Sequence, residues 1–201
     1  MSITADEFLN DVSMVAVNIP DFIALRYISE AIDQFCSRTG AIELPCELDL
    51  SAGEYEADIA TDSNIETAFY VREIRLPTGT IISEAGALNK TGSGMPSKYK
   101  LGDGLVYFNK TPATNITLTG IALMKPKRGA TLFNDLIATK YRDAIVAGAL
   151  SRALMTKASG GAWFDAQLGS YYRTVFNDEL RIAKAEVLSR SNQFLNPLRF
   201  I

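Results

Sequence analysis

Few residues in this sequence are suited to catalysis. The 201-residue chain has no histidine, which excludes imidazole acid–base catalysis, histidine-based nucleophilic triads and histidine metal sites. Glu54 and Glu56 form a carboxylate pair, and paired carboxylates are what a glycoside hydrolase uses. Acids at alternating strand positions more often form a solvated face. The sequence favours that interpretation, with a carboxylate-based cell-wall glycan hydrolase as an alternative.

Cofactor and metal motifs are equally weak. The stretches GSG (92–94) and GDG (102–104) do not have the GxGxxG or GxxxxGK[ST] spacing that holds phosphate. Cys36 and Cys46 are too few for a structural zinc site, and without CxxC spacing they are expected to be buried thiols. We therefore expect no catalytic residue, no cofactor and no metal site.

Targeting and nucleic-acid signals are also limited. No apolar run approaches the roughly 20 residues that cross a bilayer, and the opening residues 1–12 are acidic, unlike a secretory signal. We expect synthesis in the cytoplasm and no membrane partner. The basic cluster of Lys125, Lys127 and Arg128 has no interleaved aromatic residues to stack on bases, so it is typical of a solvated turn.

Charge is distributed unevenly along the chain. Residues 1–73 carry 15 acidic and three basic side chains, a net charge of −12, whereas residues 74–201 carry 8 and 17, a net charge of +9. The two parts either neutralise each other within one molecule or form acidic and basic flanks that meet between copies, head to tail. In the second case assembly should weaken at high salt.

The elements that must position these residues begin with helices. The stretch Thr4–Glu7 fits a capping box and predicts a helix from about Ala5. Apolar residues then recur every three or four positions and predict a helix from about Pro20 to Arg38, ended by Gly40. The residues on this face are Phe22, Leu25, Ile28, Ala31, Ile32 and Phe35.

Between Ala41 and Pro126 the pattern changes to short strands. The candidates are YEADI, FYVREIRL, LVYFN and NITLTGIALM, separated by Gly, Pro, Asn and Thr. Residues 88–104 are polar and glycine-rich, which indicates a long exposed loop. No helical crossover is visible, so we expect a small antiparallel sandwich or barrel.

The remaining sequence predicts a helical hairpin. One helix is expected from about Leu132 to Ala158, with Gly148 inside it where another backbone approaches closely. Gly160-Gly161 should end that helix, and a second should run from about Ala162 to Arg190. Its apolar stripe is Phe164, Leu168, Tyr171, Tyr172, Val175, Phe176, Ile182 and Val187, and Trp163 is expected in the hairpin core.

The order of these segments resembles the head-to-tail adaptor (connector) proteins of tailed bacteriophages. The resemblance rests on TADEFLNDV, PDFIALRYISEAIDQFCSRTG, LDLSAGEYEADI, MPSKYKLGDGLVYFNKTP and RDAIVAGALSRALMTKASGGAWFDAQLGSYYRTVFNDEL, in this order. It implies an α+β fold in which residues 1–44 and 127–190 form an antiparallel helical bundle. Residues 45–126 form an inserted antiparallel β-sandwich or barrel-like subdomain, and residues 191–201 form an extended tail.

The resemblance also implies a function without enzymatic activity. Such a protein is a virion component at the head–tail interface, present in the host cytoplasm before assembly. About a dozen copies form a homo-oligomeric ring that binds the portal protein and other tail or neck proteins. Genome DNA passes through the lumen without sequence-specific binding. A neck or tail-completion protein further from the portal is an alternative.

The C-terminal tail is expected to carry the portal contact. Helix should fade near Ser191, because Ser-Asn interrupts the stripe and Pro197 forbids regular helix beyond it. The tail is nevertheless rich in large apolar residues, unlike a solvated end. It either folds back on its own subunit or orders in a portal groove. The contact candidates are Phe194, Leu195, Leu198, Arg199, Phe200 and Ile201.

Overall fold

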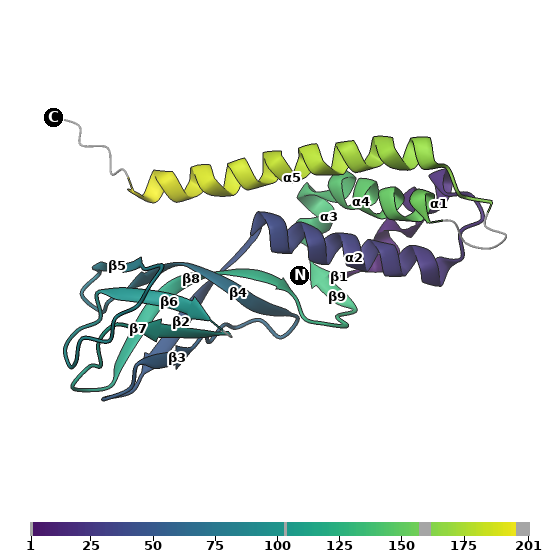
Figure 1. The fold of residues 1–201 in the computed structure, drawn as a ribbon. Helices are drawn as coiled ribbons and strands as arrows, with labels where there is room; N and C mark the ends of the chain where they lie inside the picture. The colour runs from purple at the N-terminus through teal and green to yellow at the C-terminus, as the bar shows by residue number, and fades with distance from the viewer. Residues whose placement is uncertain (1, 103, 157–161, 196–201) are drawn as a thin grey trace. The chain divides into compact units, whose positions relative to one another are not determined.

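Helices and strands form separate parts of the chain. The structure, a computed structural model, describes the backbone of residues 2–102, 104–156 and 162–195, and side chains in these ranges up to Arg190. The helices in these ranges are α1 (Leu9–Val15), α2 (Asp21–Thr39), α3 (Leu136–Lys140), α4 (Arg142–Met155) and α5 (Ala166–Leu195), with a 3₁₀ helix, η1, at Ala5–Phe8. The strands are β1 (Ser2–Thr4), β2 (Ile42–Leu50), β3 (Glu56–Asp58), β4 (Glu66–Arg75), β5 (Ile81–Glu84), β6 (Lys98–Gly102), β7 (Leu105–Phe108), β8 (Ile116–Pro126) and β9 (Leu132–Asn134). The expected mixture of helices and strands is confirmed (Figure 1).

The chain divides into two compact units. The helical unit comprises Met1–Ile42 and Pro126–Ile201, and the β unit comprises Glu43–Lys125. In the helical unit α4 packs against both α2 and α5, and β1 pairs with β9. These contacts place segments that lie more than 100 residues apart in the sequence side by side.

Helix α2 agrees with its predicted limits. It ends at Thr39, and Gly40 follows with a φ of 64°, a left-handed conformation that glycine adopts without a Cβ clash. Most of the predicted apolar face is buried, including Ile28, Ile32 and Phe35. Phe22 was placed on that face wrongly, because it is 74% exposed in the first turn, ahead of the region where α4 covers the helix.

The capping box at Thr4 does not form. Thr4 is the last residue of β1 and pairs with Leu132 of β9, and its side chain makes no capping hydrogen bond. A 3₁₀ helix begins at Ala5 instead, and α1 follows at Leu9. The prediction of a helix near this point is confirmed, while the predicted cap is wrong because strand pairing sets the geometry.

The single helix predicted from Leu132 to Ala158 is wrong. Leu132–Asn134 is strand β9, and the helical part is broken at Tyr141, which lies between α3 and α4. The Asn134 side chain accepts a hydrogen bond of 3.1 Å from the Leu136 amide and so starts α3 locally. The Tyr141 ring packs 4.8 Å from the Phe35 ring of α2, measured between centroids.

Helix α5 is displaced along the sequence from its prediction. It begins at Ala166 because the Asp165 carboxylate accepts a hydrogen bond of 2.9 Å from the Leu168 amide, in the manner of an N-cap. Trp163 therefore lies in the turn before the helix, where it is only partly buried, and its expected place in the core is wrong. At the other end α5 continues to Leu195, beyond the predicted fade at Ser191. Ser and Asn cost well under about 1 kcal/mol each in a helix, too little to end one.

The buried face of α5 is narrower than the predicted stripe. Its buried residues include Phe176, Leu180, Ala183 and Val187, which recur at four, three and four positions. Phe164, Tyr171 and Ile182 are exposed, contrary to prediction. A close approach at Gly148 is confirmed, but the predicted backbone neighbour is wrong, because the nearest atoms belong to side chains: a Cβ there would lie 2.8 Å from the Phe176 ring and 3.0 Å from the Cβ of Ala31.

The β unit is a curled seven-stranded sheet. Its strand order is β2-β8-β4-β5-β6-β7-β3, and an isolated bridge between Glu47 and Ala60 joins β2 to the segment that follows β3. The sheet therefore nearly closes into a barrel. The expectation of a wholly antiparallel sheet is wrong, because β5 and β6 pair in parallel.

The predicted loop at 88–104 contains strand β6. Tyr99 of β6 is 2% exposed, and its hydroxyl donates a hydrogen bond of 3.2 Å to the Val71 carbonyl oxygen of β4. One buried aromatic residue thus anchors a strand whose neighbours Lys98 and Lys100 face solvent. The four predicted strands correspond to β3, β4, β7 and β8, whereas β2 and β5 were also missed.

Candidate interaction site

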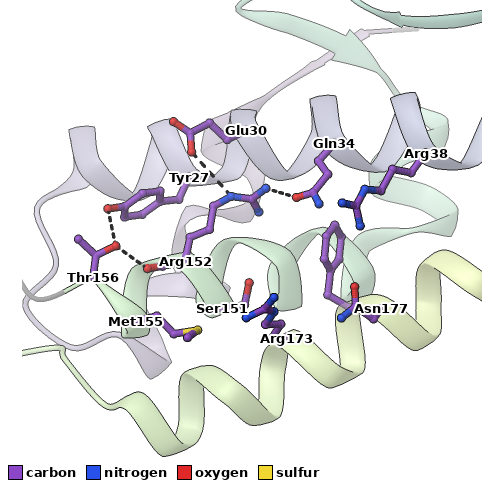
Figure 2. Close-up of a pocket in the computed structure, with 11 residues that line it drawn as sticks. Tyr27, Glu30, Gln34, Arg38, Ser151, Arg152, Met155, Thr156, Arg173 and Asn177 are labelled. Carbon is purple, nitrogen blue, oxygen red and sulfur yellow. Dashed lines mark hydrogen bonds and ion pairs between the residues drawn. The ribbon is translucent and has the colours of Figure 1, made fainter.

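The helical unit contains a cleft formed by α2, α4 and α5. Its volume is about 490 Å³, and Figure 2 shows side chains from the three helices pointing into it. The lining residues are Tyr27, Glu30, Gln34, Arg38, Ser151, Arg152, Met155, Thr156, Arg173, Phe176 and Asn177. The hairpin of α4 and α5 is therefore covered by α2 on one side and leaves an open polar flank.

Arg152 is held rigidly at the centre of this cleft. Its guanidinium donates hydrogen bonds to the Gln34 side-chain oxygen and, at 3.0 Å, to the Gly148 carbonyl oxygen, and its Nε lies 3.7 Å from a Glu30 carboxylate oxygen. Burial lowers the pKa of Arg152, while Glu30 raises it and Arg38 lowers it further. Arg152 stays charged, because the pKa of free arginine is above 12.

Hydrogen bonds close the cleft at the end of α4. The Tyr27 hydroxyl donates to Thr156 Oγ1 at 3.0 Å, and the Thr156 hydroxyl donates to the Arg152 carbonyl oxygen at 2.8 Å. The Arg152 carbonyl oxygen also accepts a hydrogen bond of 3.1 Å from the Thr156 backbone amide, so Thr156 binds the end of α4 twice while its hydroxyl links it to α2.

Two exposed arginines give the cleft its positive charge. Arg38 of α2 and Arg173 of α5 line it. Neither of these arginines forms an ion pair with a described residue. A second hollow of about 350 Å³ adjoins the first and shares Arg38 and Asn177 with it. We call the two together the basic cleft. Its cationic residues are Arg38, Arg152, Arg173, Arg181 and Lys184.

The outer surface of the β unit carries the opposite charge. In β2 and β3, buried apolar residues alternate with exposed acids, as strand geometry requires. We call these acids the acidic face, which consists of Glu47, Asp49, Glu56 and Asp58. Glu54 lies in the turn before β3 and is also exposed, so the carboxylates suggested by sequence for a hydrolase are on open surface.

Both cysteines lie in the core. Cys36 and Cys46 are buried thiols that form no disulfide, which confirms their interpretation as core residues. Burial raises the pKa of Cys46 to about 11, which keeps this thiol protonated at neutral pH. Among the described residues no group of three or more His, Cys, Asp or Glu side chains is placed to hold a metal ion.

The uneven charge of the sequence is partly neutralised within the chain. Arg142 pairs with Asp11 at 2.8 Å, Arg152 lies 3.7 Å from Glu30, and Arg75 pairs with Glu73. Each pair joins an acid from residues 1–73 to a base from residues 74–201. Internal pairing therefore accounts for some of the imbalance, while the basic cleft and the acidic face retain the rest.

An exposed apolar group lies between α1 and α2. Met14, Val17 and Phe22 are 80%, 57% and 74% exposed. Sequence reasoning missed Met14 and Val17 and assigned Phe22 to the core, because a short helix and its turn give too little periodicity to separate the faces.

The predicted tail contacts lie at the limit of the described chain. Phe194 and Leu195 belong to the last turn of α5, for which only the backbone is described. Leu198, Arg199, Phe200 and Ile201 lie outside the described residues. Their assignment as portal contacts stays a prediction.

The basic cleft was not foreseen from the sequence. Arg38 lies more than 100 residues before the other cations, so no local motif unites the whole set. A weak signal was present at Arg152, the one charged residue between Ala144 and Met155 of α4. In the part of the chain that the structure describes, no helix has an apolar stretch long enough to cross a bilayer.

Comparison with known proteins places this arrangement in a family. Comparison with curated proteins finds no match. A family model described as "SU10 adaptor protein" matches residues 3–199. Because this match covers nearly the whole chain, the resemblance to phage head-to-tail adaptors is confirmed, and the chain belongs to the SU10 adaptor protein family.

Proposed function

We propose that this protein is a structural component of the virion that forms a ring, joins the portal vertex of the head to the tail and lines the DNA exit channel. The family match over residues 3–199 is the observation that carries the proposal. The match supports a role as a phage adaptor. The ring, the portal contact and the lining of the DNA channel are part of this proposal.

Two surfaces of the chain support assembly into a ring. A closed ring uses a heterologous interface, in which one surface of each copy contacts a different surface of the next. The basic cleft and the acidic face are two such surfaces of opposite charge on one chain. About a dozen copies related in this way would enclose a lumen through which DNA passes without base-specific contacts.

The portal contact is assigned to the C-terminal tail. Phe194 and Phe200 would act as aromatic anchors in a portal groove, with Leu195, Leu198 and Ile201 beside them and Arg199 paired with an acid. Large apolar side chains in well-packed pockets supply most of the energy of an interface. Helix α5 extends to Leu195 and would present the start of this segment in helical form.

The test is assembly with purified portal protein. The full chain and portal are mixed, and the mass of the complex is measured by sedimentation velocity and its shape by electron microscopy. The proposal expects a ring of about a dozen copies seated on the portal. A ring that binds tail components but does not bind portal would indicate a neck protein instead.

Two truncated chains locate the portal contact. A chain ending at Leu195 keeps all of α5, and a chain ending at Arg190 also removes its last helical residues. If the tail docks on portal, both should keep the thermal stability of the full chain but lose portal binding. If both truncated chains bind portal as well as the full chain does, the tail assignment is rejected. The proposed ring is then tested separately by the measured mass of the complex.

A further inference from the structure

We propose that the basic cleft of one copy receives the acidic face of the neighbouring copy. This inference rests on the proposed ring and names the interface that closes it. The occupant is a second copy of this chain, contributing the carboxylates of Glu47 and Asp49 on β2 and of Glu56 and Asp58 on β3.

The acidic face is a rigid, preformed surface. The backbone groups of Glu47 and Ala60 exchange two hydrogen bonds of 2.9 Å, which hold β2 beside the segment following β3. Asp49 accepts a hydrogen bond of 2.7 Å from the Thr117 hydroxyl, which orients its carboxylate. All four acids are exposed, and none has an ion pair with a residue in the described part of the chain.

A cation on the same outer surface, Lys100, lies further along the sheet. Tyr107 of β7 pairs with Glu56 on one side and with Lys100 of β6 on the other, so a whole strand separates Lys100 from Glu56. In the described part of the chain, neither Lys100 nor Lys90, which lies 4.6 Å from the centre of the Tyr55 ring, forms an ion pair with an acid of this face. The acidic face thus keeps its negative charge available to a partner.

The basic cleft presents a row of polar and basic side chains along α5. Arg173, Asn177, Arg181 and Lys184 recur at four, four and three residues, which places them on one stripe of α5. Four residues rise about 6 Å along a helix, and alternate strand residues are spaced about 6.6 Å apart. A strand lying along α5 would therefore set one carboxylate opposite the Arg173 guanidinium and the next opposite the Asn177 side-chain amide, whereas Arg173 and Arg181, eight residues apart, are separated by about 12 Å.

The charge pattern favours this occupant. The cleft is lined by one acid, Glu30, which is already engaged by Arg26 at 2.8 Å and approached by Arg152. Arg181 is paired with Asp178 on the exposed side of α5, which leaves Arg38, Arg173 and Lys184 as the cations most open to an incoming carboxylate. Arg guanidinium groups bind carboxylates with two parallel hydrogen bonds. Each copy offers both surfaces, so a head-to-tail repeat uses all of them.

Charge reversal tests the pairing directly. The variants are Arg173→Glu, Glu56→Arg and the double variant, each as the full chain. Arg128→Glu, at an exposed turn, is a control with the same charge change as Arg173→Glu. Circular dichroism melting checks folding, and sedimentation velocity with portal measures the protein concentration at half-assembly. Each single variant should raise that concentration at least tenfold, and the double variant should recover most of the loss. A second pair, Lys184→Glu and Asp58→Arg, replaces any variant that does not fold.

The outcomes separate this interface from the ring itself. A wild-type chain that forms no ring with portal rejects the proposed function and the interface together. A wild-type ring with single variants that assemble normally, or a folded double variant without recovery, rejects the interface alone. In a third outcome, Arg173→Glu abolishes portal binding while the Glu56→Arg variant forms rings as the wild type does. The cleft then binds portal and not a neighbouring copy, which also overturns the inference.

Discussion

The helical unit and the β unit bury their cores with side chains of different size. Between the helices many buried residues are small, including Ala24, Ala31, Ala147, Gly148 and Ala153. Inside the curled sheet they are mostly large, including Leu48, Val71, Ile74, Tyr99, Phe108, Leu118 and Met124. Small residues let helices approach closely, whereas a nearly closed sheet has an interior that large side chains must fill.

Each unit nevertheless has a glycine at a point where elements approach closely. At Gly148 an added Cβ would meet the ring edge of Phe176 and a methyl group, which are side-chain atoms. At Gly120 it would lie 2.5 Å from the carbonyl oxygen of Glu73, which belongs to the backbone of β4. The comparison teaches that the nearest obstacle at Gly148 is a side chain that can move, whereas at Gly120 it is the backbone of a strand.

The largest expected effect comes from emptying the helical core. Phe176→Ala removes a 3% exposed ring packed over Gly148, and we expect a loss of about 3 to 5 kcal/mol in the free energy of unfolding. Urea denaturation followed by circular dichroism measures it. Ile182→Ala, on the same helix but 62% exposed, is the matched control and should cost under about 0.5 kcal/mol. Equal losses for the two variants would contradict the assignment of the buried face of α5.

The two glycines give a smaller effect that tests the comparison itself. Gly120→Ala should destabilise the β unit by about 1 to 3 kcal/mol, because the strand that carries Glu73 cannot yield cheaply. Gly148→Ala should cost less, since the Phe176 ring can shift and alanine regains up to about 1 kcal/mol of helix propensity. Parallel urea titrations measure both. A larger loss at Gly148 would show that the helices are the more rigid unit.

Elements set by local sequence could be predicted well. The limits of α2 follow from its apolar period and from Gly40, and strands β4 and β8 follow from their β-branched and aromatic residues. Elements set by distant pairing could not. The predicted helix start at Leu132 is strand β9 because Leu132 pairs with Thr4 of β1. Strand β6 is held in place by the hydrogen bond from Tyr99 to Val71. These partners carry no local signal.

The candidate site was less predictable than the fold. Arg38, Arg152 and Arg173 meet only because three helices pack together, and single-sequence patterns do not report such contacts. The difference in charge between the two parts of the sequence did indicate complementary flanks. It did not show which charges form ion pairs within the chain, such as Arg142 with Asp11, and which remain unpaired on the surface.

The smallest expected effect is a pH dependence confined to the helical unit. Glu186 of α5 accepts hydrogen bonds from Lys140 of α3 and, at 2.6 Å, from Arg190, and these two cations lower the pKa of Glu186 below its ordinary value of 4.5. Because the folded pKa lies below the unfolded one, the link stabilises the fold at neutral pH, and this contribution is lost as pH falls through the folded pKa. The carboxylate is 35% exposed, so solvent screening should limit the contribution to under about 1 kcal/mol. Glu186→Gln should therefore lower the melting temperature slightly at pH 7 and have no effect well below pH 4. Asp33→Asn, at an exposed site on α2, is the control, and the change in wild-type melting temperature between these two pH values should be the same in this variant. A Glu186→Gln deficit that persists undiminished in acid would show that the side chain acts by packing, without a charge contribution.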